Sequence, residues 1–335
     1  MTIRTSGLLV ATISILSACG GAPPPEPAAP PAAPTPPPAA VEAPAPTAAA
    51  TPAPAAEPAK PAAPTPIFRV TEGIMTPESV LWDEAGDRYL VSNINGVPNA
   101  ADNNGYITEL SPDGKVVKDK FIAGGVGKVK LDAPKGSGIA GGVFYVTDIT
   151  VVRKFDAKSG APKGEIKIPG STFLNDLAIA KDGRIYVSDT GVKPGEKGFD
   201  PTGTDAVYEI DKTGKVKTLA KSKDLGGPNG LLVVDNGVLV NTLLSNELYR
   251  LDDKGAKQDV TKLPNGGLDG LASTGDSLLV SSWGASAIYK GKLGGTFEVV
   301  LADLKGPADF GYDSKRKRVL VPRFMDNAVE AYELK

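Results

Sequence analysis

The chain has 335 residues, and its 37 Lys and Arg are nearly balanced by 39 Asp and Glu, which gives a formal net charge of −2. Without a basic field, nucleic acid is not an expected partner. Histidine is absent and Cys19 is the single cysteine, so imidazole general bases, Ser-His-Asp and Cys-His catalysis, His-ligated metals and an internal disulfide are all excluded.

Residues 1–21 have the pattern of an export signal. Arg4 gives the positively charged start, and the apolar run that follows is too short to span a bilayer. The run ends in residues 16–20, Leu-Ser-Ala-Cys-Gly, which resemble the bacterial lipobox and imply lipidation of Cys19 after cleavage. The alternative is an ordinary secretory cleavage site with a small residue at that position. A lipid anchor with several acyl chains attaches a protein stably without spanning the membrane.

The lipobox implies a place in the cell. We expect a bacterial cell-envelope protein that touches the membrane only through its lipid and faces the periplasm or the cell surface. Gly20 stands where an aspartate is often associated with retention in the inner membrane, so the outer membrane is favoured.

Residues 22–66 are predicted to be a disordered tether. They contain 18 Pro and 18 Ala, with few charges and no apolar pattern that could build a core. Polyproline II geometry would let this segment reach up to roughly 140 Å at about 3.1 Å per residue. A segment that binds a specific partner domain is the alternative, but no distinguishing motif supports it.

Residues 67–335 carry one short phrase six times. Its second position is occupied in turn by Glu78, Lys135, Asn175, Asn229, Asp269 and Ala308, at separations of 57, 40, 54, 40 and 39 residues. We call these six the ring positions. A period near 40 built from β-type segments is typical of a β-propeller with one blade per repeat.

Each repeat continues with further strand patterns separated by turn residues. Second strands are predicted at 88–92, 143–147, 184–188, 238–241, 278–281 and 319–322. Third strands are predicted at 105–110, 151–155, 206–210, 247–251, 287–290 and 328–332, and turns then lead to a fourth strand. The sequence therefore predicts an all-β, six-bladed β-propeller with four antiparallel strands per blade. Because the last repeat stops after its third strand, residues 68–70 are expected to close the ring by joining the last blade.

Two repeats are longer than the others because of the loop between their second and third strands. These loops are residues 95–104 and 191–204, and that loop returns to the face where the first strand begins. We expect both to overhang the mouth of the central channel, where the ring positions converge. Long loops on a rigid scaffold often carry binding functions.

Four ring positions hold oxygen-bearing side chains that could ligate a hard cation: Glu78, Asn175, Asn229 and Asp269. Two carboxylates and two amide oxygens suit Ca²⁺ first, then Mg²⁺ or Mn²⁺, with Zn²⁺ a further candidate. Taken singly, Asn-Gly and Asp-Gly are also common turn dipeptides. Lys135 could bind a substrate carbonyl or neutralise the carboxylates, and the residues leave both roles open.

The folded region resembles the senescence-marker-protein, gluconolactonase and luciferin-regenerating-enzyme family over nearly its whole length. The resemblance is carried by the Glu78 phrase, by Asn175-Asp176, by residues 228–231 (Pro-Asn-Gly-Leu) and by residues 269–271 (Asp-Gly-Leu), in the family's order. It implies one divalent metal held by Glu78, Asn229 and Asp269, with Asn175 beside it in contact with substrate or water. It also implies hydrolysis of a lactone, with the metal polarising the carbonyl and helping to activate water, Asp269 as general base and Asn175 orienting the substrate.

One departure from the family bears on the substrate. Phe173 stands where sugar-lactone members carry an arginine, which removes a polar contact to substrate hydroxyls. A more apolar lactone or ester therefore becomes an equal candidate. Phe173, Lys135 and Asp189 are the residues expected near the substrate at the mouth, although a turn role would explain Asp189 equally well. Trp82 and Trp283 are interpreted as packing residues.

Two functions follow from these observations. The first is a metal-dependent hydrolase of a small-molecule lactone or related ester. The alternative is a non-catalytic tethered propeller that acts as a binding or scaffold module at the cell envelope, in which any metal is structural. A lactonase of the paraoxonase type is disfavoured because that chemistry uses histidine. The oligomeric state is left open.

Overall fold

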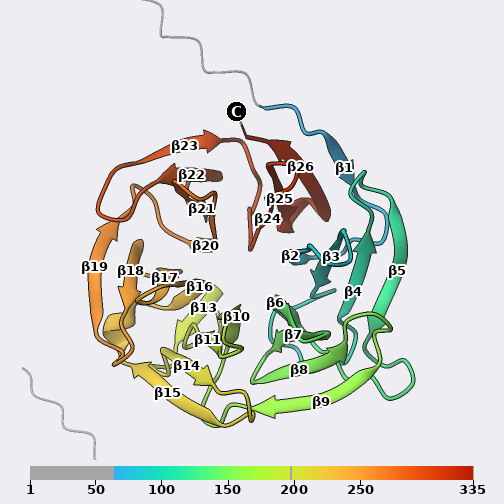
Figure 1. The fold of residues 1–335 in the computed structure, drawn as a ribbon, viewed down its shortest axis with the longest axis horizontal. Coiled ribbons are helices and arrows are strands. Elements are labelled where there is room, and N and C mark those ends of the chain that lie inside the picture. Colours follow the sequence, from blue (N-terminus) through green and yellow to red (C-terminus); the bar gives the residue numbers. More distant parts are fainter. Residues whose placement is uncertain (1–63, 197, 335) are drawn as a thin grey trace, which may run out of the picture. The chain divides into compact units, whose positions relative to one another are not determined.

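The computed structural model describes residues 64–196 and 198–334. These residues form six four-stranded antiparallel sheets arranged around a central axis, with the first strand of each sheet nearest the axis (Figure 1). The predicted six-bladed β-propeller is confirmed. The export signal with Cys19 and the tether lie outside the described residues, apart from residues 64–66. None of the helices in the described part is long and apolar enough to cross a membrane.

The blades follow one another along the chain. Blades 1 to 3 consist of β2 (Pro77–Asp83), β3 (Arg88–Asn93), β4 (Tyr106–Leu110) and β5 (Val116–Ala123); β6 (Pro134–Ala140), β7 (Val143–Asp148), β8 (Val151–Asp156) and β9 (Pro162–Lys167); and β10 (Leu174–Ile179), β11 (Ile185–Asp189), β14 (Ala206–Ile210) and β15 (Val216–Lys221). Blades 4 and 5 consist of β16 (Pro228–Val234), β17 (Gly237–Thr242), β18 (Glu247–Leu251) and β19 (Lys257–Lys262); and β20 (Leu268–Ser273), β21 (Leu278–Ser282), β22 (Ala287–Gly291) and β23 (Phe297–Leu301). Blade 6 consists of β24 (Gly311–Asp313), β25 (Arg318–Arg323), β26 (Ala328–Glu333) and β1 (Phe68–Val70).

The sixth blade is assembled from both ends of the described chain. Strand β1 pairs antiparallel with β26, with Phe68 opposite Ala331 and Val70 opposite Val329. Because β1 precedes blade 1 and belongs to blade 6, it joins the two blades across the point where the ring closes (Figure 1).

The hydrophobic core lies between the blades. Alternating side chains of each sheet point to its two faces, and each face packs on the next blade. Tyr186 and Val207 of blade 3, for example, pack with Val240 and Tyr249 of blade 4 in one cluster. The described residues form six such clusters, one for each blade junction. The rigid stack that results fixes the inner strands around the channel.

The inner strands of blades 1 to 5 are irregular at the ring positions. The pairing register shifts around Glu78 in β2, and equivalent shifts occur in β6, β10, β16 and β20. A β-bulge bends its strand and re-aims the side chain it carries. The dipeptides Asn229-Gly230 and Asp269-Gly270 therefore lie within strands rather than at hairpin turns.

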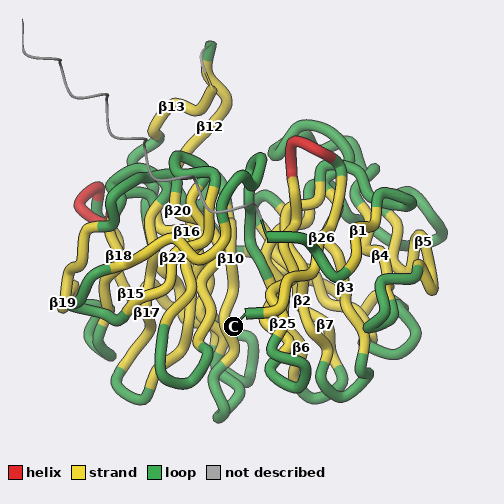
Figure 2. Tube along the Cα trace, turned by 90° about the horizontal axis from the view of Figure 1, so that it is seen from above, coloured by secondary structure: helices red, strands yellow, loops and turns green. Residues whose placement is uncertain are grey.

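The long loop of blade 3 forms a hairpin of its own. Strands β12 (Val192–Gly195) and β13 (Gly198–Pro201) pair antiparallel and project from one face of the propeller (Figure 2). Two short 3-10 helices complete the described part of the chain, η1 (Lys223–Leu225) and η2 (Phe324–Asp326).

Candidate functional site

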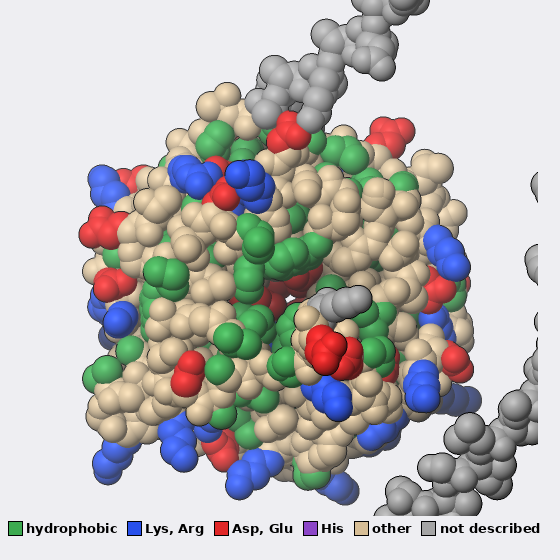
Figure 3. Space-filling model, turned by 180° about the vertical axis from the view of Figure 1, so that it is seen from behind, with side chains coloured by type: hydrophobic (Ala, Val, Ile, Leu, Met, Phe, Trp, Pro, Cys, Tyr) green, Lys and Arg blue, Asp and Glu red, His purple; other side chains and the backbone are tan. Residues whose placement is uncertain are grey.

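The central channel opens into a cavity of about 460 Å³ on the face that carries the β12–β13 hairpin. Five ring positions line this cavity and are nearly inaccessible to solvent: Glu78, Lys135, Asn175, Asn229 and Asp269. Figure 3 looks onto this face and shows acidic side chains deep in an opening surrounded by hydrophobic ones. The structure thus brings together the four predicted oxygen donors and Lys135. Ala308, at the sixth ring position, is buried and not part of the lining.

Both overhanging loops contribute to the cavity wall. Val97 and Pro98 come from the loop of blade 1, and Pro194, Gly198 and Phe199 come from the hairpin of blade 3. The expected position of the two long loops over the mouth is therefore confirmed.

Hydrogen bonds fix the side chains of Asn229 and Asp269, and in each side chain one oxygen has no hydrogen-bond partner. Asn229 donates from Nδ2 to Leu268 O at 2.9 Å, and Trp283 Nε1 donates to Asp269 Oδ2 at 2.7 Å. Asn229 Oδ1 and Asp269 Oδ1 are buried without a hydrogen-bond partner in the described structure, and so is Glu78 Oε2. Buried polar atoms without partners are rare in folded proteins, so three on residues that line one cavity indicate a place for an ion or ordered water.

The donor set matches a hard cation. Two carboxylates and an amide, each with an unpaired oxygen at the cavity, are the ligand types that Ca²⁺ and Mg²⁺ prefer. Within residues 64–196 and 198–334, no group of three or more His, Cys, Asp or Glu side chains is placed to hold a metal ion, so a metal site here would have to include the amide oxygen of Asn229. Glu78, Asn229 and Asp269 therefore fit the divalent metal that the resemblance implies.

Asn175 is oriented by its neighbours in the ring. Its Nδ2 donates to Thr190 Oγ1 at 3.0 Å, and its backbone oxygen accepts a hydrogen bond from Thr147 Oγ1 at 2.6 Å. Thr147 belongs to blade 2, so a hydroxyl on one blade fixes a ring position on the next. The same arrangement recurs where Asn241 Nδ2 donates to Asp269 O at 2.6 Å.

Four carboxylates share the interior of the channel. Burial and the charges of Asp269 and Asp309 raise the pKa of Glu78 well above its usual range, and burial with Asp309 raises the pKa of Asp269 to about 7. Burial raises the pKa of Asp309 to about 6, and burial together with Asp309 raises that of Asp176. Like charges in a desolvated site disfavour ionisation, and a bound cation would relieve this repulsion.

Sequence reasoning missed Asp309 and left Asp176 without a role, although a signal was present. Each of them directly follows a ring position, Asn175 in blade 3 and Ala308 in blade 6. Ser79, in the same place of blade 1, donates its hydroxyl to Asp309 Oδ2 at 2.6 Å. Aligning the repeats one position further on shows Ser79, Asp176 and Asp309 in three blades and glycine in the other three, so the two buried carboxylates could have been found this way.

Lys135 is a buried cation on the floor of the cavity. Its Nζ donates to Ala133 O at 3.1 Å and lies 4.4 Å from the centre of the Phe173 ring. Burial lowers the pKa of Lys135, while the charges of Glu78 and Asp148 oppose that shift. The charge of Lys135 in turn partly opposes the rise in the pKa of Glu78.

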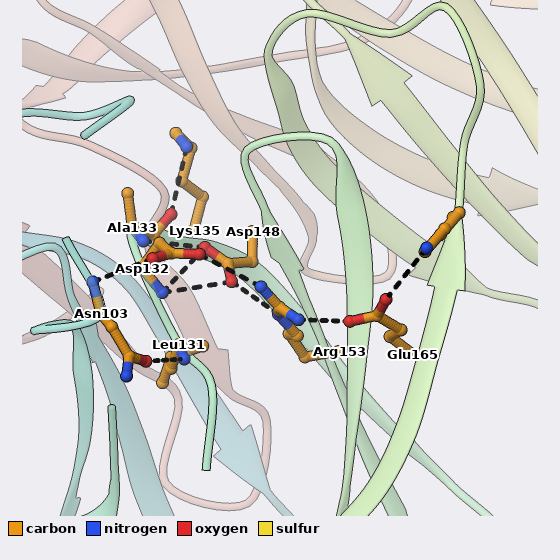
Figure 4. A network of polar contacts seen from close by, with 9 residues as sticks. Asn103, Leu131, Asp132, Ala133, Lys135, Asp148, Arg153 and Glu165 are labelled. Atoms are coloured by element: carbon orange, nitrogen blue, oxygen red, sulfur yellow. Dashed lines mark hydrogen bonds and ion pairs between the residues drawn. The ribbon is translucent and has the colours of Figure 1, made fainter. Parts of the chain in front are cut away.

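Asp148 holds the backbone that positions Lys135. Its Oδ1 accepts hydrogen bonds from Asp132 N at 3.1 Å and from Ala133 N at 2.8 Å, and its Oδ2 accepts one from Arg153 Nε at 2.7 Å (Figure 4). The carbonyl of Ala133 is the group that binds Lys135 Nζ, so the network ends at the cavity floor.

Asp189 plays the corresponding role in blade 3. Its fully buried carboxylate accepts hydrogen bonds from Phe173 N at 2.9 Å and from Gly191 N at 3.1 Å. Asp189 therefore holds the loop that carries Phe173, and its own side chain is not part of the cavity wall, whereas Phe173 is. Trp283 also lines the cavity and bonds Asp269, so its part in the site goes beyond packing.

The raised pKa of Asp269 predicts how the metal-free protein responds to pH. Between its ordinary value of 3.8 and about 7, the folded state holds a proton that the unfolded chain releases, so the free energy of unfolding falls as pH rises. When urea unfolding is measured in the presence of a chelator, we expect the free energy of unfolding to fall on the order of a few kcal/mol between about pH 5 and 7.5. The free energy of unfolding of Asp269→Asn should fall less over this range, so that the variant is more stable than the parent at the higher pH. An equal loss in both proteins would contradict this account.

Comparison with known proteins was made at the level of sequence and of structure. A scan against protein-family models and a search of curated proteins find no match for the sequence. Among solved structures, a gluconolactonase from Xanthomonas campestris has a TM-score of 0.60 at 19% identity, with 84% of this chain and 99% of that chain covered. The chain has the fold of these propellers.

Two further structures show how widely this fold is used. The calcium-binding protein regucalcin from Agrobacterium tumefaciens has a TM-score of 0.58 at 16% identity, with 79% of this chain and 93% of that chain covered. A virginiamycin B lyase from Staphylococcus aureus has a TM-score of 0.55 at 14% identity, with 80% and 99% covered. Similarity at this level of identity is similarity of fold, and function has to be inferred from the site.

Proposed function

We propose that this protein is a divalent-metal-dependent hydrolase of a lactone or related ester, with Ca²⁺ as the preferred ion. The observation that carries the proposal is the set of three unpartnered, buried oxygens, Glu78 Oε2, Asn229 Oδ1 and Asp269 Oδ1, which line one cavity open to solvent. The fold is shared with a gluconolactonase and with the calcium-binding protein regucalcin, so the same scaffold is known with a lactone-hydrolysing protein and with a calcium-binding one.

Glu78, Asn229 and Asp269 would hold the divalent ion, and three residues of the floor have further roles in this reaction. When bound, the divalent ion supplies a Lewis acid for the substrate carbonyl. Asp269, held at Oδ2 by Trp283, accepts the proton of the attacking water through its carboxylate. Asn175, fixed through Nδ2 by Thr190, orients the substrate, and Lys135 offsets the negative charge of the channel.

The absence of histidine separates this reaction from that of the lyase with the same fold. A histidine-to-alanine variant of virginiamycin B lyase from Staphylococcus aureus is catalytically inactive. This chain has no histidine, so it cannot use that residue type. A carboxylate-based hydrolysis needs none.

The test is a calorimetric titration of chelator-treated protein with Ca²⁺ and with Mn²⁺. We expect saturable one-site binding that weakens about 100-fold or more in Glu78→Gln and in Asp269→Asn, because each substitution removes a charged ligand. Glu298→Gln, an exposed glutamate on β23, is the matched control and should bind like the parent. The ion-loaded parent should then hydrolyse lactones or esters in a screen, and the two ligand variants should not. Failure of the parent to bind either ion would overturn the hydrolase and leave a tethered interaction module.

We also propose that the protein is anchored to the bacterial envelope, with the outer membrane favoured, through a lipid on Cys19. The support is the sequence of residues 16–20 together with the Pro/Ala-rich segment that follows. Cells that express the full chain should incorporate labelled palmitate into it, and fractionation should place it with the membranes. Cys19→Ser should abolish the label, because the acceptor thiol is gone. A Cys19→Ser protein that still incorporates the label would show that the lipid is attached at another residue and would overturn this proposal.

A further inference from the structure

A second ring of residues lies at the mouth of the cavity, above the ring positions. In blades 1 to 5 the second strand ends with a residue paired to the start of the first strand, such as Asn93 opposite Pro77 and Ser282 opposite Leu268, and in blade 6 Arg323 forms the equivalent bridge to Pro307. The next residue in the six blades is Ile94, Ile149, Thr190, Leu243, Trp283 and Phe324. Five of these six are apolar, and four of them line the cavity: Ile94, Leu243, Trp283 and Phe324. The repeat thus places an apolar ring directly over a polar one.

Two aromatic pairs give this wall a fixed shape. Trp283 and Phe324 have their ring centres 5.2 Å apart, and Phe173 and Phe199 meet edge to face at 5.3 Å. The hydrogen bond that Trp283 donates to Asp269 locks the indole, and the one that Phe173 N donates to Asp189 fixes the backbone of Phe173. We call these four aromatic residues, together with Ile94 and Leu243, the collar. The collar is a preformed surface, as small-molecule sites usually are.

The polar groups of the cavity are confined to its floor. The lining residues with polar side chains are the five ring positions, and the rest of the described lining is apolar or glycine. Phe199 is 41% exposed and Val97 is 58% exposed, so apolar surface continues out to the rim. Figure 3 shows hydrophobic side chains around much of the opening.

We infer that the substrate carries its reacting ester or lactone group on the floor and an apolar substituent, an alkyl chain or an aromatic ring, against the collar. This inference rests on the proposed hydrolase function and adds the class of substrate. A polyhydroxylated sugar lactone would leave its hydroxyl groups buried against a wall without donors or acceptors, which is unfavourable. An alkyl substituent instead buries apolar surface along the collar, and each methylene adds to binding.

The experiment measures kcat/KM of the Ca²⁺-loaded full chain on δ-lactones that carry no substituent, methyl, propyl, pentyl or heptyl, and on glucono-δ-lactone. We expect kcat/KM to rise about fourfold for each methylene until the substituent passes the rim, and glucono-δ-lactone to be the poorest substrate. Phe199→Ser should flatten this dependence on chain length. Val117→Ser removes another exposed apolar side chain, on β5 and outside the lining, and should behave like the parent.

A binding measurement separates this inference from the proposed hydrolase. The parent is titrated with hydrolysis-resistant δ-lactams of the same substituents, and tryptophan fluorescence reports binding because Trp283 lines the cavity. Tighter binding with chain length but no hydrolysis of any lactone supports the collar and overturns the hydrolase. Turnover of glucono-δ-lactone that equals or exceeds that of the heptyl lactone supports the hydrolase and overturns the collar. Binding and turnover that are both independent of chain length also overturn the collar.

Discussion

A chain that begins at residue 72 is expected to lose most of its free energy of unfolding compared with a chain that begins at residue 64. The missing segment includes β1, the outer strand of blade 6. Val70 is buried in the cluster between blades 6 and 1, and Phe68 stacks on Tyr89 of blade 1 with ring centres 6.3 Å apart. Arg69 also donates a hydrogen bond to Glu330. When the truncation removes Arg69, Glu330 keeps only the hydrogen bonds from Arg323 and Tyr332.

The size of the effect follows from these contacts. Burial of Val70 and part of Phe68 contributes about 3 kcal/mol, and each backbone hydrogen bond to β26 contributes about 1 kcal/mol. The sum, on the order of 5 kcal/mol, is comparable with the whole stability of many domains. The loss also exposes β26 as an open edge, which favours aggregation.

Urea unfolding followed by circular dichroism is the measurement. A chain that begins at residue 67 is the matched control, because it lacks only the segment before β1 and should unfold like the chain that begins at residue 64. If the chain that begins at residue 72 unfolds at the same urea concentration as the other two, then β1 contributes little to the free energy of unfolding.

The fold was predictable because one repeat specifies it six times. Each blade repeats the same order of inner phrase, turn and second strand, so errors at single elements average out. The bulges were not foreseen, and they decide where the ring positions point. Asn229-Gly230 has the composition of a turn but lies in β16, where the glycine is needed because the neighbouring blade leaves no room for a side chain at position 230.

The site was predicted in part, and what was missed depends on side-chain direction beyond the ends of strands. The four oxygen donors follow from the repeat alone. The bond from Trp283 to Asp269 could not be foreseen, because strand alternation does not fix the direction of a side chain after the last strand residue. The burial of Lys135 likewise depends on a loop conformation that the carboxylate of Asp148 imposes through Ala133 N.

Gly230→Ala is expected to destabilise the protein by about 3 kcal/mol and to weaken Ca²⁺ binding. A Cβ at this position would lie 2.1 Å from Asp269 O and 2.9 Å from Asn241 Nδ2. These two atoms are joined by the 2.6 Å hydrogen bond that holds blades 4 and 5 together at the ring. The new methyl group can be accommodated only by a shift of backbone, and that shift moves Asp269, one of the three proposed ligands.

Gly138→Ala in β6 is the matched control, since it adds the same methyl group to another inner strand. Its nearest neighbours would be the side-chain ends of Ile179 and Leu177, at 3.0 and 3.1 Å, which can turn away. We expect Gly138→Ala to stay within about 1 kcal/mol of the parent and to bind Ca²⁺ normally. Urea unfolding and calorimetry of both variants test the link between blade packing and the metal site. Gly230→Ala that is destabilised but binds Ca²⁺ like the parent would contradict the proposed link. Either Asp269 is then not a ligand, or its position does not depend on the junction of blades 4 and 5.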